Sequence, residues 1–330
     1  MQTNNEKILR AEATDQGAKV LKISLGPIRP FFDDPEVVEI MLNPDRHLWV
    51  ERIGQPCMDT GIIISPEESA RVIKLVASYC HTVVTENNPI LSAELPNFGS
   101  RFEAVLPPVT TAPVFSIRQP ARKLFDLQDY IDKGIMSPRQ VEIIKQGVRD
   151  KKNILFVGGT GTGKTTATNA VLDEIAKTGD RLVILEDTKE LQCSAPNVVF
   201  LRTQDNIDMT RLLKSTMRLR PDRIVVGEVR DGAALALLKA WNTGHPGGIS
   251  TIHADNAYAG LLRLESLIQE AIPSPQPQLI AEAVDIVIYI ERAHFSRRVK
   301  EMAFVNGYKD GVFQLDPVPL VAGYARSVCG

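Results

Sequence analysis

The distribution of apolar and polar residues changes near Lys151 in this chain of 330 residues. From there on, short runs of apolar and β-branched residues alternate with stretches at helical spacing. The runs read NILFV, RLVILE, NVVFL, RIVVGE, GISTIH and VDIVIYI. Strands that are apolar on both faces are typical of a parallel sheet with helices on either side. This part of the chain is therefore predicted to be an α/β domain.

The first third of the chain predicts a smaller α/β unit. Residues 34–45, DPEVVEIMLNPD, have helical spacing up to Asn43-Pro44 and are predicted to form a helix. A second helix is predicted to begin at Pro66, because Ser65 and Glu68 match the two ends of a capping box. Three segments are predicted as strands: HLWVER, RFEAVLPPV and PVFSIRQ.

The segment between these two regions is predicted to be a linker. Its composition, with Gly134 as a helix stop, places the linker at residues 126–137. The N-terminal domain then spans residues 1–125 and the C-terminal domain residues 138–330. Near the end of the chain, RRVKEMAFVNGYKDGVFQLDPV predicts a β-hairpin that turns at Asp310-Gly311.

A loop rich in glycine and threonine follows the strand NILFV and precedes a helix predicted over residues 164–177. It fits the pattern G-x-x-x-x-G-K-[ST]. The glycines let consecutive backbone N–H groups turn inward, where they hold the β-phosphate together with the positive end of the helix dipole. The lysine reaches the β- and γ-phosphates, and the hydroxyl that follows it ligates Mg²⁺. The predicted nucleotide-binding residues are Gly158, Gly159, Thr160, Gly161, Thr162, Gly163, Lys164, Thr165 and Thr166.

Hydrolysis also needs a carboxylate that positions a water in line with the γ-phosphate. Two strands end in acids: RLVILE ends in Glu186, with Asp187 after it, and RIVVGE ends in Glu228. The carboxyl ends of parallel strands share one edge of the sheet, where ligands bind. Gly227 stands where such a strand usually has its aspartate, and it permits a close backbone approach. The alternative is that both acids cap the helices that follow them.

A third candidate is the histidine that ends the strand GISTIH. His253 should lie on the same sheet edge as Gly158 and Glu228, where it could sense the γ-phosphate or its water. A purely structural histidine is the alternative. A zinc site is not favoured, because no third ligand is clustered near His245 and His253.

Composition narrows the function classes. The net charge of −2 gives no general basic field for nucleic acid, although a local basic groove stays open. The four cysteines lie outside CxxC spacing, so reduced thiols are expected. No apolar window reaches the ~20 residues of a membrane span, and the N-terminus is not a secretory signal. A soluble protein is therefore expected. The cysteines are Cys57, Cys80, Cys193 and Cys329.

Four motifs in this order resemble the secretion ATPases of type II and type IV secretion systems. They are GGTGTGKTT, the acidic box ILEDTKELQC, then RLRPDRIVVGEVRD, and the histidine box TGHPGGISTIHADNA. The N-terminal segments EIMLNPDRHLWVER, NPILSAELPNFGSRFEAVLPPV and FSIRQPA are similar to the conjugal-transfer, TrbB-type branch. The resemblance covers residues from about 25 to 310. The chain departs at Asp255, where the family often has asparagine.

The resemblance implies an α/β fold in which a smaller, PAS-like N-terminal domain precedes a C-terminal RecA-like P-loop NTPase domain. It also implies arginines from the N-terminal domain that reach the phosphates, at Arg101 and Arg118, although each could simply be a surface ion-pair residue. The implied catalytic residues are Glu228, Lys164, Glu186, His253, Arg118 and Arg101. The implied ligands of Mg²⁺ are Thr165, Glu186 and Glu228. Arg218, Arg220 and Arg230 also fall in family motifs and could equally brace a subunit interface.

The function implied is a homohexameric motor that hydrolyses ATP with Mg²⁺ to power type IV secretion, pilus assembly and DNA transfer in conjugation. Its partners would be inner-membrane components of a type IV secretion system. It would be cytoplasmic and peripheral at the inner face of the bacterial inner membrane, without sequence-specific nucleic acid binding. Two alternatives stay open: a RecA-like DNA-translocating helicase or recombinase, and a nucleotide-binding scaffold that hydrolyses poorly. The first should show basic loops and stacking aromatic residues, but only 6% of residues are aromatic.

Overall fold

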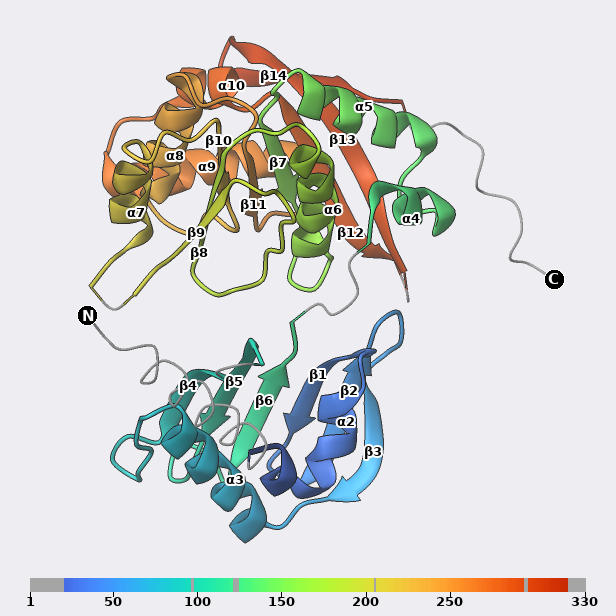
Figure 1. Cartoon of the computed structure of the whole chain (residues 1–330), viewed down its shortest axis with the longest axis vertical. Coiled ribbons are helices and arrows are strands. Elements are labelled where there is room, and N and C mark those ends of the chain that lie inside the picture. The colour runs from blue at the N-terminus through green and yellow to red at the C-terminus, as the bar shows by residue number, and fades with distance from the viewer. Residues whose placement is uncertain (1–20, 96–97, 121–124, 205, 294–295, 320–330) are drawn as a thin grey trace, which may run out of the picture. The chain divides into compact units, whose positions relative to one another are not determined.

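The chain folds into two compact units, Met1–Lys123 and Leu124–Gly330, in the computed structural model (Figure 1). The structure describes residues 21–95, 98–120, 125–204, 206–293 and 296–319. Each unit contains one sheet, so the fold is mixed α/β with two sheets. The expected linker residues include a helix, α4 (Leu127–Asp132), whose Leu127 and Tyr130 are buried in the core of the second unit.

The first unit has an antiparallel sheet of six strands in the order β3-β2-β1-β6-β5-β4. One face is covered by helices, and Phe32, Ile40, Ile73 and Phe102 are buried there. The other face carries mainly polar residues at the alternate positions of the strands, together with apolar ones such as Met41 and Trp49. The helices are η1 (Gly26–Ile28), α2 (Arg29–Asp33) and α3 (Pro66–Tyr79). The strands are β1 (Val37–Leu42), β2 (His47–Arg52), β3 (Met58–Ile63), β4 (Ile90–Leu95), β5 (Ser100–Val105) and β6 (Val114–Arg118).

The helix predicted over residues 34–45 is wrong, because this segment contains β1. Ile40 and Leu42 point into the core at strand spacing, and β1 pairs with β2 on one side and β6 on the other. A short apolar run can match helical spacing by chance, and here pairing on both sides decides the outcome. The three predicted strands and the helix from Pro66 are confirmed, and the Ser65 hydroxyl accepts a hydrogen bond from the Glu68 N–H.

The second unit has a sheet of eight strands in the order β14-β13-β12-β7-β11-β10-β8-β9. The pairs from β12 to β9 are parallel, and β13 and β14 extend the sheet in antiparallel pairing. The strands are β7 (Ile154–Val157), β8 (Leu182–Glu186), β9 (Val198–Arg202), β10 (Arg223–Val226), β11 (Ile249–Ile252), β12 (Ile286–Ala293), β13 (Ser296–Lys309) and β14 (Val312–Pro317). All six predicted strands are confirmed, and the hairpin turns at Asp310-Gly311 as predicted.

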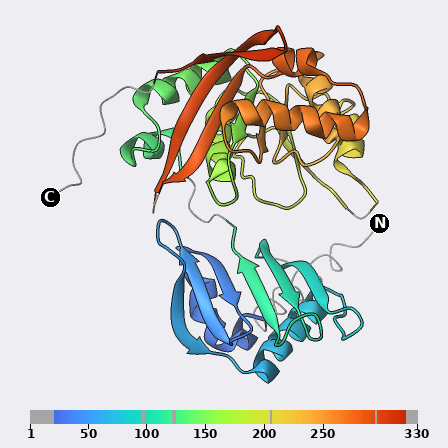
Figure 2. The same cartoon turned by 180° about the vertical axis from the view of Figure 1, so that it is seen from behind.

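Helices cover both faces of this sheet. Figure 1 views the face covered by α4, α5 (Pro138–Arg149) and α6 (Lys164–Ala176). Figure 2 shows α9 (Ala257–Ala271) over the opposite face, where α7 (Met209–Thr216), α8 (Ala233–Asn242) and α10 (Pro277–Ala283) also pack. None of the helices in the described parts of the chain is long and apolar enough to cross a membrane.

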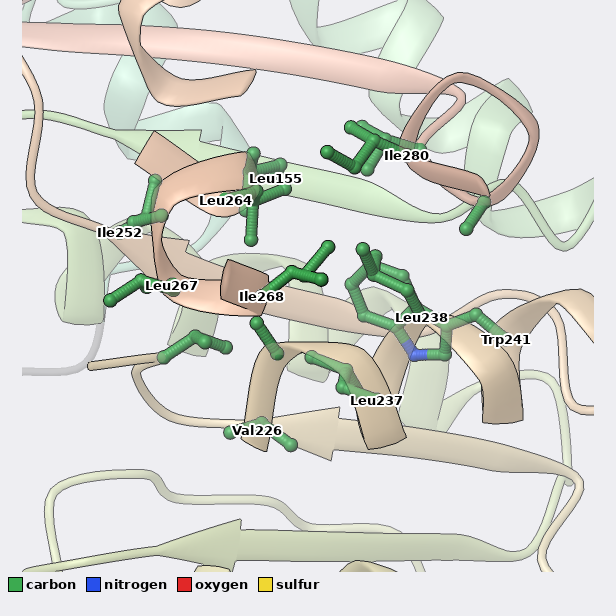
Figure 3. Packing of buried hydrophobic residues seen from close by; sticks show 14 of the residues in the cluster. Leu155, Val226, Leu237, Leu238, Trp241, Ile252, Leu264, Leu267, Ile268 and Ile280 are labelled. Carbon is green, nitrogen blue, oxygen red and sulfur yellow. The ribbon is translucent and has the colours of Figure 1, made fainter. Parts of the chain in front are cut away.

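Strand residues alternate between the two cores, as expected for a sheet buried on both faces. Ile154 and Phe156 join the core under α5 and α6, whereas Leu155 and Val157 join the core under α8 and α9. Figure 3 shows the second core, in which strand side chains meet three helices. The labelled residues are Leu155, Val226 and Ile252 from strands, and Leu237, Leu238, Trp241, Leu264, Leu267, Ile268 and Ile280 from helices.

Candidate active site

The site lies at the carboxyl edge of the parallel strands in the second unit. Neighbouring strands β7, β11, β10 and β8 end at this edge, and the candidate residues follow them directly. Backbone hydrogen bonds continue past the strand ends, from Gly158 N to the Ile252 carbonyl and from Gly227 N to the Leu185 carbonyl. The parallel pairing therefore brings Lys164, His253, Glu228 and Glu186 to one edge, as predicted.

The glycine-rich loop has a shape that only glycines adopt easily. Gly161 and Gly163 have φ angles of +71° and +93°, in the left-handed region. A Cβ on Gly158 would collide with the Ile290 carbonyl oxygen of β12 and would lie 2.7 Å from Thr162 Oγ1. Strand β12 thus packs closely against the loop at Gly158. The loop leads into α6, and the N–H groups at the N-terminus of this helix can bind an anion.

Lys164 begins α6 and turns its ammonium group back over the loop. Its Nζ donates hydrogen bonds to the carbonyl oxygens of Gly158 and Gly159, both at 2.9 Å. The same Nζ lies 3.4 Å from His253 Nδ1. The residue is only 7% exposed, so its charge is held inside the loop by carbonyl oxygens that a phosphate could replace.

Glu228 lies between a histidine and an arginine. Its Oε1 is 2.6 Å from His253 Nε2, a contact that lacks hydrogen-bond alignment. Its Oε2 accepts hydrogen bonds from Arg230 Nε at 2.9 Å and from Arg230 Nη2 at 2.6 Å. This bonding raises the pKa of Arg230 above its ordinary value. Lys164, His253, Glu228 and Arg230 therefore form a continuous row of polar groups across the edge.

Glu228 does not have the alternative role of a helix cap. The N–H of Ala233 at the start of α8 is accepted by Asp231 Oδ1 at 2.8 Å instead. A cavity of about 230 Å³ opens beside Glu228, and its other polar lining residues are Asp187, Thr203, Asp208, Arg230 and Asp231. Such a space is large enough to hold water next to the carboxylate.

Glu186 has a different environment. It is 5% exposed, and its Oε1 accepts hydrogen bonds from the backbone N–H groups of Glu190 (2.9 Å) and Leu191 (2.7 Å). Burial raises the pKa of the Glu186 carboxyl, although the two N–H groups oppose this rise. Glu186 thus accepts hydrogen bonds from backbone N–H groups, as the capping alternative predicts, but these groups belong to a loop and not to a helix.

That loop brings a residue to the site that sequence reasoning missed. Glu190 Oε2 accepts a hydrogen bond from Thr165 Oγ1 at 3.1 Å, and Thr165 directly follows Lys164. The signal was present, because Glu190 is the third acid of the box LEDTKELQC. A second missed residue is Arg297 of β13, whose Nε donates to the Gly161 carbonyl at 3.3 Å. No motif marks Arg297, since its position depends on the pairing of β12 with β7.

The first unit brings its two candidate arginines together. Arg101 of β5 and Arg118 of β6 are directly opposite in the antiparallel register. Glu39 is the partner of Arg118 on β1, and Glu94 is the partner of Arg101 on β4. The four charges thus lie in the order Glu39, Arg118, Arg101, Glu94 across neighbouring strands, and the glutamates offset the repulsion between the arginines. The two adjacent guanidinium groups are a candidate anion site on this face of the sheet.

The described residues contain no group of three or more His, Cys, Asp or Glu arranged to hold a metal by themselves. A Mg²⁺ ion shared with phosphates needs only one or two carboxylates and keeps several waters. Cys57, Cys80 and Cys193 are free thiols, and burial raises the pKa of Cys80 and Cys193. Cys329 lies outside the described residues.

Known proteins resemble this chain over most of its length. The family model "Type II/IV secretion system protein" matches residues 24–303. The conjugal transfer protein TrbB of Rhizobium radiobacter is 50% identical over 286 residues, which cover 86% of this chain and 88% of that protein. The type IV secretion system protein VirB11 of Bartonella henselae is 30% identical and covers 88% of this chain and 94% of that protein.

A solved structure supports the fold. The ATPase DotB of Yersinia pseudotuberculosis matches with a TM-score of 0.60 at 20% identity, over 84% of this chain and 77% of that chain. The matched residues 24–303 include the glycine-rich loop, Glu228 and His253, so the similarity extends over the candidate site. The chain therefore belongs to the type II/IV secretion system protein family.

Proposed function

We propose that this chain is the motor that hydrolyses ATP to power a type IV secretion system for DNA transfer in conjugation. The observation that carries the proposal is the row Lys164–His253–Glu228 at the carboxyl edge, next to the glycine-rich loop. The relatives named for conjugal transfer and type IV secretion support the process that the motor serves.

Nucleotide binding fits the loop. The glycines at positive φ let backbone N–H groups converge, and the start of α6 adds the positive end of a helix dipole. We propose that residues 158–166 hold the phosphates. Lys164 would exchange the Gly158 and Gly159 carbonyls for phosphate oxygens, which are stronger partners for an ammonium group.

Mg²⁺ fits the acids beside Thr165. The Thr165 hydroxyl can be a direct ligand of Mg²⁺, because it donates its proton to Glu190 and its oxygen lone pairs stay available for the metal. Glu186 and Glu228 would hold metal-bound waters, Glu186 through the oxygen that its backbone partners leave open. Bound Mg²⁺ would neutralise charge on the β- and γ-phosphates. Glu186 would also keep the 186–191 loop in place.

Glu228 is the proposed base that positions the attacking water. Its Oε1 is buried and accepts no aligned hydrogen bond, so it can take one from a water. Arg230 holds the other carboxylate oxygen, which fixes the orientation of the group. His253 lies between Glu228 and Lys164, where it can respond to the terminal phosphate.

Arg101 and Arg118 are proposed to contact the phosphates from the first unit. Their direct opposition across β5 and β6 supports this role, because two neighbouring guanidinium groups match the oxygens of a phosphate, with Glu39 and Glu94 flanking them in register. The first unit would then be the PAS-like domain of the family and the second unit its RecA-like P-loop domain. The active form is proposed to be a homohexamer, bound at the inner face of the inner membrane through other secretion components.

The test is phosphate release from ATP and Mg²⁺ by the full chain and by Glu228→Gln. Loss of a general base lowers the rate by about 10²–10⁴-fold, whereas nucleotide binding should persist. Equal rates for the two proteins would contradict the assignment of Glu228. Single-stranded DNA should leave the rate unchanged, and strong stimulation would favour a DNA-translocating motor instead. Native mass measurement with and without ATP tests for six chains of 36.4 kDa.

A further inference from the structure

The hairpin of β12 and β13 contacts the glycine-rich loop from outside. Strand β12 pairs in parallel with β7, with Tyr289 opposite Val157, immediately before the loop begins. The Ile290 carbonyl oxygen then lies so close to Gly158 that a Cβ there would collide with it. Strand β13 returns in antiparallel pairing with β12 and carries Arg297 at its start.

Arg297 touches the loop at two places. Its Nε donates a hydrogen bond to the Gly161 carbonyl oxygen at 3.3 Å. Its Cδ lies 2.9 Å from the position that a Cβ on Gly163 would occupy, so the side chain rests on the backbone of that glycine. A side chain at position 163 would collide with Arg297, so this contact requires glycine there. Gly161, at the tip of the loop, thus has a charged hydrogen-bond partner that no sequence motif predicts.

The hydrogen bond to Gly161 has a consequence for the next residue. In a trans peptide, the C=O of Gly161 and the N–H of Thr162 belong to one plane and point in opposite directions. Holding the carbonyl toward Arg297 thus turns the Thr162 N–H to the other side of the loop. We propose that Arg297 is a positioning residue that orients this amide toward the phosphates of the bound nucleotide.

Charge strengthens the effect. An arginine stays protonated at all working pH values and donates in a fixed geometry. Its neighbour Arg298 is a suitable contrast, because adjacent strand residues point to opposite faces. Arg298 bonds Glu291 through Nε and Nη2, both at 2.6 Å, and both of these side chains are away from the loop contacts described above.

The inference rests on the proposed function, and the experiment separates the two. Full-length wild type, Arg297→Ala, Arg297→Gln, Arg297→Lys and the control Arg298→Ala are compared for KM and kcat with ATP and Mg²⁺. The Kd for fluorescent ADP is measured in parallel. A wild type that neither binds nor hydrolyses nucleotide would overturn the proposed function itself.

With an active wild type, Arg297→Ala and Arg297→Gln should raise KM and the Kd for ADP by about tenfold, because a charge-assisted hydrogen bond is lost. The kcat should stay within about twofold, since the amide binds ground state and transition state alike. Arg297→Lys should recover part of the affinity, and Arg298→Ala should match the wild type.

A merely structural role gives a different pattern. It would lower kcat in proportion to the folded fraction, with KM unchanged, and it would lower the temperature of the thermal transition that Trp241 fluorescence reports in a Trp49→Phe background. That pattern, or an Arg297→Ala variant that binds ADP as tightly as Arg298→Ala, would overturn the inference. If Arg297→Ala fails to fold, the Gln and Lys variants retain the stem and still decide the outcome.

Discussion

The two sheets of this protein present their charged residues in different ways. In the second unit, Glu228 and His253 follow the ends of parallel strands, and Lys164 begins the helix after the glycine-rich loop at the same edge. In the first unit, Arg101 and Arg118 lie within antiparallel strands, on a sheet face. The first arrangement depends on strand order, and the second depends on register.

The difference affects how each region can carry function. Residues that follow strand ends or begin a helix at this edge can turn toward one another, so their groups form a row from Lys164 through His253 to Glu228. Strand residues have their direction set by the pleat, so two arginines in register can only offer charge at a fixed spacing. We therefore expect the chemical step to depend on the second unit, with the first unit supplying charge for the phosphates.

The largest expected effect tests the second unit alone. Lys164→Ala removes the donor that lies within the loop, and turnover should fall about 10³-fold or more, below detection in a phosphate-release assay. The matched control is Lys177→Ala, at the other end of the same helix, where the ammonium forms exposed pairs with Asp173 and Glu174. If Lys164→Ala hydrolyses ATP as fast as this control, the proposal that the glycine-rich loop binds the phosphates is contradicted.

The next effect tests whether the first unit takes part at all. An arginine that stabilises transition-state charge contributes about 10³-fold or more in rate, so Arg118→Ala and Arg101→Ala should each slow turnover by about 10²–10³-fold. The control is Lys74→Ala on α3, which is exposed on the covered side of that sheet. Steady-state kinetics and circular dichroism are measured together. Rates within twofold of the control would leave the two arginines as surface residues.

Sequence reasoning predicted the second unit well, because its signals are local. A motif marks the loop, apolar runs mark the strands, and parallel order follows from their composition. The common edge of Gly158, Glu228 and His253 needed only the rule that parallel strands end together. The roles of these residues stay predictions.

The missed features depend on contacts between distant segments. The strand β1 matched helical spacing, and its pairing with both β2 and β6 decided otherwise. Glu190 reaches Thr165 only because Glu186 holds the backbone of the intervening loop. Arg297 is 136 residues from Gly161 and reaches it through the sheet. No local pattern contains such information.

A smaller effect concerns the support of the second unit. Arg223 is 1% exposed, and its Nε donates to Asp180 Oδ2 at 2.7 Å. Asp180→Asn leaves this guanidinium without a counter-charge and should lower the free energy of unfolding of the second unit by about 3 kcal/mol. The measurement is urea unfolding followed by Trp241 fluorescence in a Trp49→Phe background, since each unit contains one tryptophan. Arg223 also donates to the carbonyl oxygens of Gly247 and Val148. An unchanged midpoint would show that these two hydrogen bonds are enough to hold the buried guanidinium.

The smallest effect concerns an ion pair of the first unit, between Lys22 and Asp33, which is more exposed than the pair of Arg223 and Asp180. Lys22 Nζ donates to Asp33 Oδ1 at 2.6 Å, and the two side chains are 35% and 38% exposed. Solvent screening weakens such a pair, so Asp33→Asn should lower the free energy of unfolding of the first unit by less than about 1 kcal/mol. The measurement is urea unfolding followed by Trp49 fluorescence in a Trp241→Phe background.

The sign of its pH dependence identifies the pair. The hydrogen bond from Lys22 lowers the pKa of Asp33 below its ordinary value of 3.8, with burial opposing it. A lowered folded-state pKa gives stability that is present above the unfolded value and is lost as the pH falls through the folded value. The wild type should therefore exceed Asp33→Asn near neutral pH; the difference should shrink below about pH 4 and vanish as the pH falls through the lowered folded-state pKa. A difference in the free energy of unfolding that persists in acid would assign the effect to packing of the Asp33 side chain. The contrast between a buried ion pair in the second unit and a solvent-screened ion pair in the first would then fail.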